Sequence, residues 1–449
     1  MGLVNILSGY VCQTSYDDLP DAVITATKDR IIDFFGVALS GYKSNVHKPA
    51  LKALERYHTS NGASVIGEDV KLPCDLTAFI NSSLCLDMTD GSRAAALHPG
   101  PVVIPAALAA AEVADKASGK DLMLAIALGY EVMIRVGRAM NPSAVKRGFH
   151  PTSIVGPLGS AVAAAKIMNL NETCMSNILS IAAVSGSGLL DALRAPEPFA
   201  QVQVARACHA GVLAVLLGQS GIKGRDSILE GAFMPAFSDQ YNLELVTTDL
   251  GKDYMIPKTY IKMHAGCRHI HAPIDAALHT VNSNGINWRD IQQISVRTYS
   301  VALDLEVEEP KTGDEAKFNI PFGVAVALVH GDAFVDKFTD QNLKDKQVQK
   351  LMTTVTVERD PDLDRGYPLK RGAIVEITAK GGSVFRHAVD LARGEPECPY
   401  SKSEIEDKFK YLTSGIIDLE VGQRIMEFVN RLETTGGISS LFMWLKART

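Results

Sequence analysis

The chain has 449 residues, of which 46% are hydrophobic and 21% are charged, and its formal net charge is −6. This composition is ordinary for a globular protein, and the length predicts two or three domains. The acidic balance argues against nucleic acid as a partner, because phosphate backbones are bound by basic surfaces.

The seven cysteines are widely spaced and none forms a C-x-x-C pair. This pattern argues against a disulfide framework and predicts a reducing compartment. Residues 1–20 lack the basic region and apolar run of a signal peptide. Residues 173–190 carry no charge, but their Ser, Asn and Gly favour a buried helix over a membrane span. We therefore expect a cytoplasmic protein with no membrane partner.

The first 260 residues predict helices joined by polar loops. Apolar residues recur with a helical period over residues 19–40. Further helices are predicted over residues 75–86, 102–113, 121–139, 154–168, 174–184 and 202–218. Asp121 stands where it would cap the helix over residues 121–139. A short strand is predicted at residues 64–66.

The pattern changes after His271. Alternating residues predict strands at 291–299 and 353–357, and a hairpin from 373–378 and 383–388. Helices are predicted over residues 322–329 and 341–352, and again after residue 401. The expected fold class is mainly α with an α+β second domain. Residues 1–268 and 393–449 would form the large all-helical domain, and residues 269–392 the smaller one.

Reactive side chains gather in four stretches between these elements. They are Asp87, Asp90, Ser92, Arg93 and His98; Lys146, Arg147, His150, Thr152 and Ser153; Arg206, Cys208 and His209; and Lys262, His264, Cys267, Arg268, His269 and His271. Cations this close together repel one another and lose hydration when buried. The last stretch, residues 260–275, therefore predicts a carboxylate or phosphate pocket, with a solvated basic loop as the alternative.

Imidazoles, carboxylates and cations in loops suit proton transfer next to a carboxylate. A base removes the proton, an acid assists the leaving group, and cations hold the substrate and spread the enolate charge. Structural roles are the alternative for some of these residues. Asp87 and Asp90 could be helix caps, and His209 could be packed between helices.

A metal site is the competing interpretation of residues 260–275. His264, Cys267, His269 and His271 offer four potential ligands within eight residues. In an extended segment Cys267, His269 and His271 would share one face, which suits zinc or a transition metal. However, Lys262 and Arg268 would repel a cation, and no second ligand pair stands at zinc-site spacing. We expect no metal and no cofactor. The chain also lacks the G-x-x-x-x-G-K-[ST] and G-x-S-x-G motifs, and no G-x-G-x-x-G follows a predicted strand.

These loops, in this order, resemble the MmgE/PrpD family of 2-methylcitrate dehydratases, cis-aconitate decarboxylases and iminodisuccinate epimerases. The resemblance covers essentially the whole chain. It is carried by Asp87, Asp90 and His98-Pro99, by residues 148–152, by Lys262, Arg268, His271 and Asp275, and by Gly394-Glu395-Pro396. It implies a helical domain with an α+β lid domain, a site between them, a metal-independent homodimer, and small di- or tricarboxylate substrates.

The resemblance also implies site roles, matching Asp87, His98, His150 and Lys262 to polar site positions. We expect His98 and His150 to share the acid–base work, with Asp87 or Asp90 orienting one of them. The expected substrate-binding residues are Lys262, Arg268, Arg206, Ser92, Arg93, Thr152, Cys267 and His271.

The chain departs from the family pattern at four places. Asp90-Gly91-Ser92 replaces Asp-Asp-Thr, Arg206 replaces a lysine, Cys267 replaces a histidine of the decarboxylases, and Phe322 replaces a tyrosine. These losses argue against cis-aconitate decarboxylation, and less strongly against 2-methylcitrate dehydration. Epimerisation tolerates them best, since it needs only proton removal and return. We expect a lyase of the 2-methylcitrate dehydratase type, with a dicarboxylate epimerase or isomerase as the alternative. A decarboxylase and a catalytically silent carboxylate-binding protein rank behind these.

Overall fold

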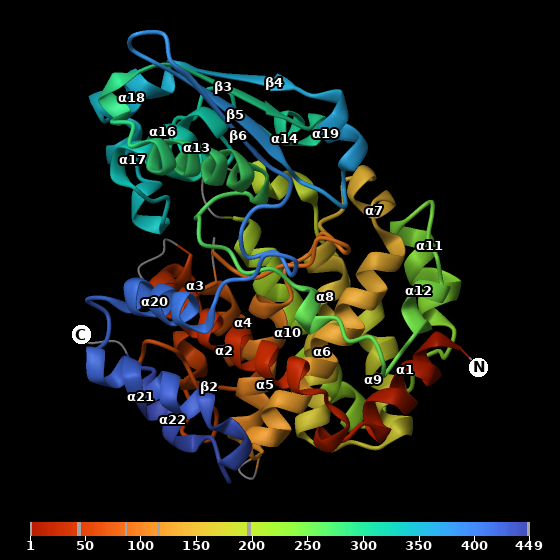
Figure 1. Cartoon of the computed structure of the whole chain (residues 1–449). Helices are drawn as coiled ribbons and strands as arrows, with labels where there is room; N and C mark the ends of the chain where they lie inside the picture. The colour runs from red at the N-terminus through yellow and green to blue at the C-terminus, as the bar shows by residue number, and fades with distance from the viewer. Residues whose placement is uncertain (1, 43–45, 86–87, 115–116, 195–198, 447–449) are drawn as a thin grey trace. The chain divides into compact units, whose positions relative to one another are not determined.

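A computed structural model describes residues 2–42, 46–85, 88–114, 117–194 and 199–446 (Figure 1). The chain forms two compact units. Unit 1 contains Met1–Leu193, Pro198–Thr259 and Ser401–Thr449, and unit 2 contains Arg194–Glu197 and Tyr260–Tyr400. Among the residues described, the regular structure of unit 1 is helical apart from one two-stranded ribbon, and unit 2 combines helices with a four-stranded sheet. The predicted fold class is therefore confirmed.

Unit 1 draws its helices from both ends of the chain. They are α1 (Leu3–Gln13), α2 (Asp21–Gly41), α3 (His47–Ala53), α4 (Cys74–Ser83), α5 (Gly100–Val113), α6 (Gly119–Met140), α7 (Ser143–Lys146), α8 (Pro151–Ile167), α9 (Glu172–Val184), α10 (Ala200–Gln219), α11 (Met234–Phe237), α12 (Glu244–Thr247), α20 (Lys402–Thr413), α21 (Leu419–Asn430) and α22 (Ser439–Trp444). The strands β1 (Ala63–Ser64) and β2 (Lys71–Leu72) pair antiparallel.

The core of unit 1 lies where α8 packs against α5, α6 and α10. Small residues let these helices approach closely. A Cβ atom on Gly129 of α6 would lie 2.9 Å from the carbonyl oxygen of Gly159 on α8. A Cβ atom on Gly211 of α10 would lie 1.8 Å from the Ser160 hydroxyl. Larger side chains at these positions would force the helices apart, since interiors are packed without spare volume.

The start of α6 corrects one prediction. Ser118 is the N-cap, and its hydroxyl accepts a hydrogen bond from the Asp121 backbone N–H, while the Asp121 carboxylate accepts one from the Ser118 N–H. Asp121 therefore completes a capping box three residues inside the cap. The reciprocal pair satisfies two N–H groups that a helix start leaves unbonded.

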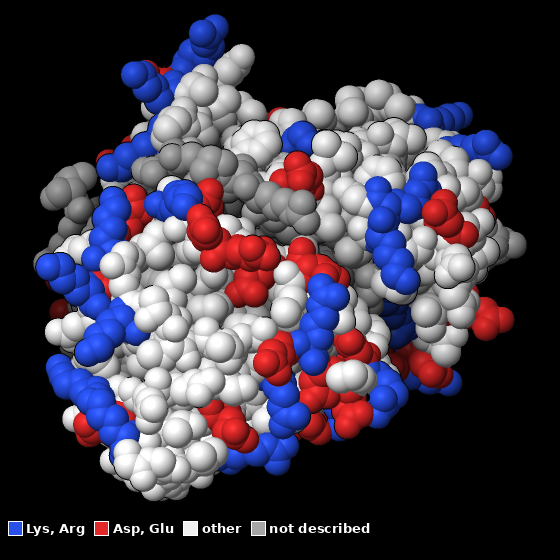
Figure 2. Space-filling view, turned by 90° about the horizontal axis from the view of Figure 1, so that it is seen from above, with Lys and Arg blue, Asp and Glu red and all other residues white. Residues whose placement is uncertain are grey.

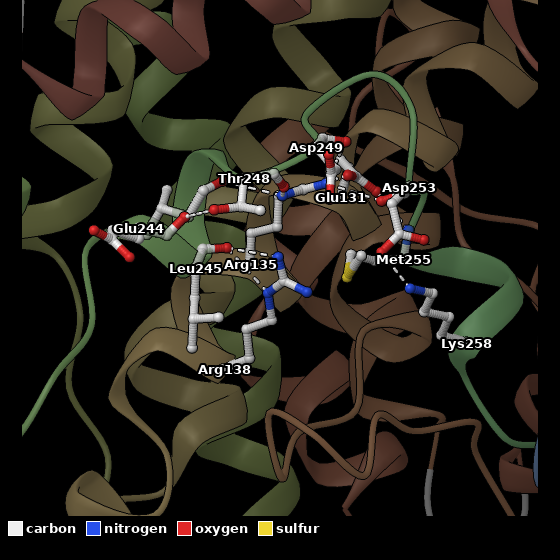
Figure 3. A network of polar contacts seen from close by, with 11 residues as sticks. Glu131, Arg135, Arg138, Glu244, Leu245, Thr248, Asp249, Asp253, Met255 and Lys258 are labelled. Atoms are coloured by element: carbon white, nitrogen blue, oxygen red, sulfur yellow. Dashed lines mark hydrogen bonds and ion pairs between the residues drawn. The ribbon is translucent and has the colours of Figure 1, made fainter.

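A buried ion pair in α6 fixes the segment that leads toward unit 2 (Figure 3). Arg135 pairs with Glu131 one turn earlier, and both side chains are fully buried. The Arg135 guanidinium also donates to the carbonyl oxygens of Thr248 (2.6 Å), Asp249 (3.1 Å) and Asp253 (2.8 Å). Because one cation satisfies several buried carbonyl groups, this segment is held without regular secondary structure.

Unit 2 is built on a mixed sheet. Its elements are α13 (His271–Asn284), β3 (Ile291–Thr298), α14 (Ser300–Asp304), α15 (Gly313–Ala316), α16 (Ile320–His330), α17 (Asp340–Leu343), α18 (Lys346–Met352), β4 (Val355–Arg359), α19 (Pro361–Gly366), β5 (Ala373–Ala379) and β6 (Val384–Val389). The strand order is β4-β3-β5-β6, with β3 parallel to β4 and the other pairs antiparallel. The helix α13 packs against β5 and β6, and α16 packs against α13 and α18 (Figure 1).

The predicted hairpin is confirmed as β5–β6, and Gly381 and Gly382 both have positive φ values at its turn. The predicted helix over residues 341–352 is wrong in one respect, because it is two helices. Asp345 ends the run, since its carboxylate accepts hydrogen bonds from the N–H groups of Gln347 and Val348 and so caps α18.

The unit boundaries also differ from the predicted ones. The segment from Tyr260 belongs to unit 2, although the prediction placed the boundary after Arg268. The reason is pairing with a distant segment: Ile261 N–H donates to the Gly394 carbonyl (3.1 Å), and Arg268 donates to the Ala392 carbonyl (3.1 Å). Residues 393–400 stay in unit 2 for the same reason, and the second boundary falls at Ser401.

One described helix, α10, is long and apolar enough to cross a membrane by length and composition alone. It packs against α4, α5, α8 and α9 inside unit 1, so the packing of a core helix accounts for its apolar residues. On the face drawn in Figure 2, Lys and Arg side chains are interspersed with Asp and Glu.

Candidate functional site

Two histidines of unit 1 stand directly before helices. His98 precedes Pro99 and the start of α5, and His150 precedes Pro151, the first residue of α8. The His98 backbone N–H donates to the Thr152 hydroxyl over 3.0 Å, which joins the two loops. The predicted residues His98, His150 and Thr152 are thus brought together, with Thr152 tying one loop to the other.

The side chain of His98 is oriented by its own loop. Its Nδ1 atom lies 2.6 Å from the carbonyl oxygen of Asp90. A carbonyl oxygen only accepts hydrogen bonds, so Nδ1 must carry the proton. In neutral His98 the lone pair is therefore on Nε2, which makes Nε2 the basic atom.

His150 has the opposite arrangement. Its Nδ1 atom lies 2.8 Å from the Ser153 hydroxyl and 3.2 Å from the Gln203 amide nitrogen. An amide nitrogen only donates, so Nδ1 of His150 accepts and the proton is on Nε2. Burial lowers the pKa of His150 to about 4, which keeps the ring neutral at pH 7. The two histidines therefore present different atoms: a lone pair from His98 and an N–H group from His150.

The Asp90 carboxyl is a buried support of the His98 loop. It accepts a hydrogen bond from the N–H of Gly100, the first residue of α5, at 3.0 Å. A Cβ atom on Gly100 would lie 2.4 Å from this carboxyl, so glycine permits the contact. Burial raises the pKa of Asp90 to about 6, opposed by the Arg30 guanidinium, whose Nε lies 3.9 Å away. The N-cap position of α5 is Pro99, so Asp90 accepts the first N–H of the helix from outside the cap position.

A buried ion pair contacts the loop that carries His98. Lys408 of α20 pairs with Asp33 of α2 at 2.5 Å and donates to the Met88 carbonyl at 2.8 Å. This contact links the C-terminal helices to the loop that carries His98. Sequence reasoning missed this pair, because its members are separated by 375 residues.

Three further predicted residues come from the same loop as His98. Ser92 is buried, and its backbone pairs with Leu97, which closes the loop. Arg93 is half-buried. Asp87, a predicted catalytic residue, lies outside the described residues.

Arg206 holds a neighbouring loop. Its guanidinium donates to the carbonyl oxygens of Ser185 and Ser187. Burial lowers the pKa of Arg206 from its usual value. These contacts give Arg206 a structural role, and its predicted contact with substrate stays a prediction.

Unit 2 contains the predicted cationic cluster. Lys262 is buried and donates to the Gly266 carbonyl at 3.1 Å. His271 is also buried, with Nε2 3.3 Å from the same carbonyl and Nδ1 3.0 Å from the Arg268 guanidinium. Since Arg268 donates to Nδ1, His271 is a neutral ring, and burial, with Arg268 nearby, holds its pKa well below the usual value.

Arg268 is engaged within unit 2. It forms a buried ion pair with Glu395 at 3.0 Å and also donates to the carbonyl oxygens of Ala392 and Arg393. Its guanidinium lies over the Tyr260 ring, 4.5 Å from the centroid. This set of contacts assigns Arg268 to holding residues 392–395, and a direct role in substrate binding stays a prediction.

The four side chains weighed as metal ligands point to different partners. His264 pairs with Asp275 at 2.8 Å, His269 bonds the Tyr299 hydroxyl, and His271 contacts Arg268. Burial raises the pKa of the Cys267 thiol, which keeps it protonated. Across the part of the chain that the structure describes, no three His, Cys, Asp or Glu side chains converge as a metal site would require.

Sequence reasoning missed Arg371. This arginine is buried, its guanidinium lies 5.9 Å from the Tyr367 ring centroid, and Tyr367 stacks on Tyr299. Burial, together with charge repulsion from Arg371 and Lys262, lowers the pKa of His269 to about 3. Lys262 and Arg371 therefore act on the same buried region of unit 2. Arg371 stands far from residues 260–275 along the chain, so no local pattern marks it.

Two family models match the chain. The MmgE/PrpD N-terminal domain matches residues 5–245, and the MmgE/PrpD C-terminal domain matches residues 264–434. The chain belongs to the MmgE/PrpD family.

Curated relatives cover nearly the whole chain. The cis-aconitate decarboxylase-like protein oryM of Aspergillus oryzae is 28% identical, over 97% of this chain and 95% of that protein. The cis-aconitate decarboxylase of Homo sapiens is 27% identical, over 95% of this chain and 91% of that protein. The cis-aconitate decarboxylase of Aspergillus terreus is 25% identical, over 98% of this chain and 95% of that protein.

Proposed function

We propose that this protein is a lyase acting on a small di- or tricarboxylate, and that its reaction is the elimination of water, as in 2-methylcitrate dehydratases. The observation that carries the proposal is the opposite hydrogen bonding of two imidazoles in unit 1. Nδ1 of His98 donates to a carbonyl oxygen, and Nδ1 of His150 accepts from an amide. We assign to His98 the neutral form with its lone pair on Nε2, and to His150 the form with its proton on Nε2. Elimination of water needs one group of each kind.

The reaction assigns one step to each ring. Nε2 of His98 takes the proton from the carbon next to a carboxylate, and the electron pair of that C–H bond forms the double bond. The C–O bond on the neighbouring carbon breaks, and the hydroxyl leaves as water with the proton from Nε2 of His150. His150 is then an imidazolate anion and His98 an imidazolium cation, so return of the proton from His98 to His150 through solvent, or the reverse reaction, resets the pair.

Carboxylate binding by unit 2 is proposed separately from the two histidines. Lys262 is buried there, and it lowers the pKa of His269 together with Arg371. A buried cation favours a nearby anion. This supports the predicted carboxylate-binding role of Lys262.

Decarboxylation is the second candidate, favoured by the relatives named as cis-aconitate decarboxylases. That reaction needs only an acid that protonates the carbanion left by CO2, a step that His150 could perform. Cys267 and Phe322 lack the imidazole and hydroxyl expected of the decarboxylases, which supports placing this candidate second.

Proton NMR in deuterated water tests these reactions. The purified protein is incubated separately with 2-methylcitrate, citrate, cis-aconitate and iminodisuccinate. A new alkene product formed with loss of water supports the proposal. Release of CO2 identifies a decarboxylase instead, and deuterium exchange without net turnover identifies an epimerase. The absence of exchange with every acid identifies a binding protein. Each of the last three results overturns the hydro-lyase assignment.

Two variants and a control accompany the assay. His98→Gln and His150→Gln should each lower kcat by about 100-fold or more, the usual contribution of general acid–base groups. His58→Gln changes an exposed histidine of unit 1 and should leave the rate unchanged. Full activity of either site variant would remove that histidine from the mechanism.

A further inference from the structure

Gln203 stands between His150 and a loop of unit 1. It lies on α10, is half-buried, and carries its amide between the backbone of Leu189 and the His150 ring. None of the sequence patterns points to this residue.

The backbone of Leu189 determines which end of the amide is oxygen. The Leu189 N–H donates to Oε1 of Gln203 at 3.0 Å, and Nε2 of Gln203 donates to the Leu189 carbonyl at 3.1 Å. A backbone N–H can only donate and a carbonyl oxygen can only accept. The reversed amide would place two donors and two acceptors face to face, so a single orientation satisfies both contacts.

The second hydrogen of the Gln203 amide is directed at His150. Nε2 of Gln203 lies 3.2 Å from Nδ1 of the ring, which must therefore accept. Ser153 also contacts Nδ1, at 2.8 Å, but a hydroxyl can donate or accept and so does not choose the tautomer. Of these two contacts, only the amide imposes a lone pair on Nδ1.

Paired backbone segments keep the amide and the ring in place. The His150 N–H donates to the Gly188 carbonyl at 3.1 Å, and the Leu190 N–H donates to the Gly148 carbonyl at 2.8 Å. Residues 148–150 thus run antiparallel to residues 188–190, and the loop that fixes the amide also carries the ring's own backbone.

We propose that Gln203 is a positioning residue that holds His150 in the Nε2–H tautomer. The inference rests on the acid role of His150 under the proposed function, because only that tautomer can give a proton from Nε2 of a neutral ring. The Ser153 hydroxyl can donate to or accept from Nδ1, so it follows the tautomer of the ring and does not set it.

The test reads the tautomer directly. The protein is labelled with 15N-histidine, and the His150 signals are assigned as those missing from the spectrum of the His150→Gln variant. The 15N chemical shifts separate a protonated from an unprotonated ring nitrogen. We expect a protonated Nε2 and an unprotonated Nδ1 at pH 7. A protonated Nδ1 in the unaltered protein would overturn the proposal without any activity measurement.

Two substitutions of Gln203 then test whether its amide sets the tautomer of His150. Gln203→Glu replaces the donor with a carboxylate, which should draw the proton to Nδ1 and lower kcat about 100-fold or more while KM changes little. Gln203→Met removes the donor without adding charge, so the His150 ring should populate both tautomers and kcat should fall less. Gln219 is an exposed residue on the same helix. Gln219→Glu makes the same charge change and should alter neither the tautomer of His150 nor kcat.

The two proposals fail in different ways. If Gln203→Glu leaves the tautomer of His150 unchanged, the positioning role is wrong whatever the reaction is. If the tautomer changes as expected but no acid is turned over by the unaltered protein, the positioning role stands and the lyase assignment fails. Should Gln203→Glu not fold, Gln203→Met and the unaltered protein decide the question, since a single tautomer retained in Gln203→Met would contradict the inference.

Discussion

Nδ1 of His98 lies 2.6 Å from the backbone carbonyl oxygen of Asp90, eight residues earlier. The bond is local, and the Ser92–Leu97 backbone pair closes the loop between the two residues. The Asp90 side chain points elsewhere, to the start of α5. The backbone of Asp90 therefore orients the histidine, and its carboxyl anchors the loop.

Asp90→Asn should change how stability depends on pH. The pKa of Asp90 is raised to about 6 when folded, so the folded protein holds a proton that the unfolded chain releases near 3.8. Stability from this group is therefore greatest at low pH and falls as pH rises through about 4 to 6. The unfolding free energy of the unaltered protein relative to Asp90→Asn should fall by about 1 kcal/mol between pH 5 and pH 7.5. Urea unfolding of both proteins measures it, and an unchanged difference would refute the raised pKa.

His150→Gln should change the pH dependence in the opposite direction. The pKa of His150 is lowered to about 4, so the unfolded chain binds a proton that the folded protein excludes. This stability is present above pH 6.5 and is lost as pH falls toward 4. Relative to His150→Gln, the unaltered protein should lose about 2 kcal/mol between pH 7 and pH 5. Urea unfolding of both proteins at pH 7 and pH 5 measures this loss. The same difference in unfolding free energy at the two pH values would contradict the expectation.

Arg135→Met should strongly destabilise unit 1. It leaves Glu131 buried without its cation and leaves the carbonyl groups of Thr248, Asp249 and Asp253 without their donor. We expect a loss of about 3–5 kcal/mol, as for other broken buried pairs. Arg138→Met is the matched control on the same helix, because Arg138 is half-buried and bonds only the Leu245 carbonyl among its described contacts. It should cost about 1 kcal/mol by chemical denaturation; equal losses would argue against the buried pair as the anchor.

Lys262→Met should weaken the binding of tricarboxylates. The substitution keeps the length of the side chain and removes a buried positive charge from unit 2. A lost charge-assisted contact of about 1.5–3 kcal/mol corresponds to roughly 10- to 150-fold weaker binding. Isothermal titration with citrate or cis-aconitate provides the measurement, and Lys380→Met, on the exposed β5–β6 turn, is the control. Equal affinity of Lys262→Met and the unaltered protein would exclude Lys262 from the anion site.

The sequence by itself determined the fold class, the family and the hairpin of unit 2. These depend on local signals: the helical period of residues 19–40, the alternation in β3, and the glycines at 381 and 382. Motif loops such as His98-Pro99 and His150-Pro151 were also visible, because the residues that define them are neighbours along the chain.

Only the tertiary structure decided what those loops can do. A histidine's protonation follows from the hydrogen-bond partner of its other nitrogen, and for His150 that partner is Gln203, 53 residues away. Arg268 pairs with Glu395, 127 residues away, and its predicted contact with substrate stays a prediction. A hydrogen bond forms between atoms that are close in space with a donor facing an acceptor. The spacing of residues along the chain does not predict which distant residues meet in this way.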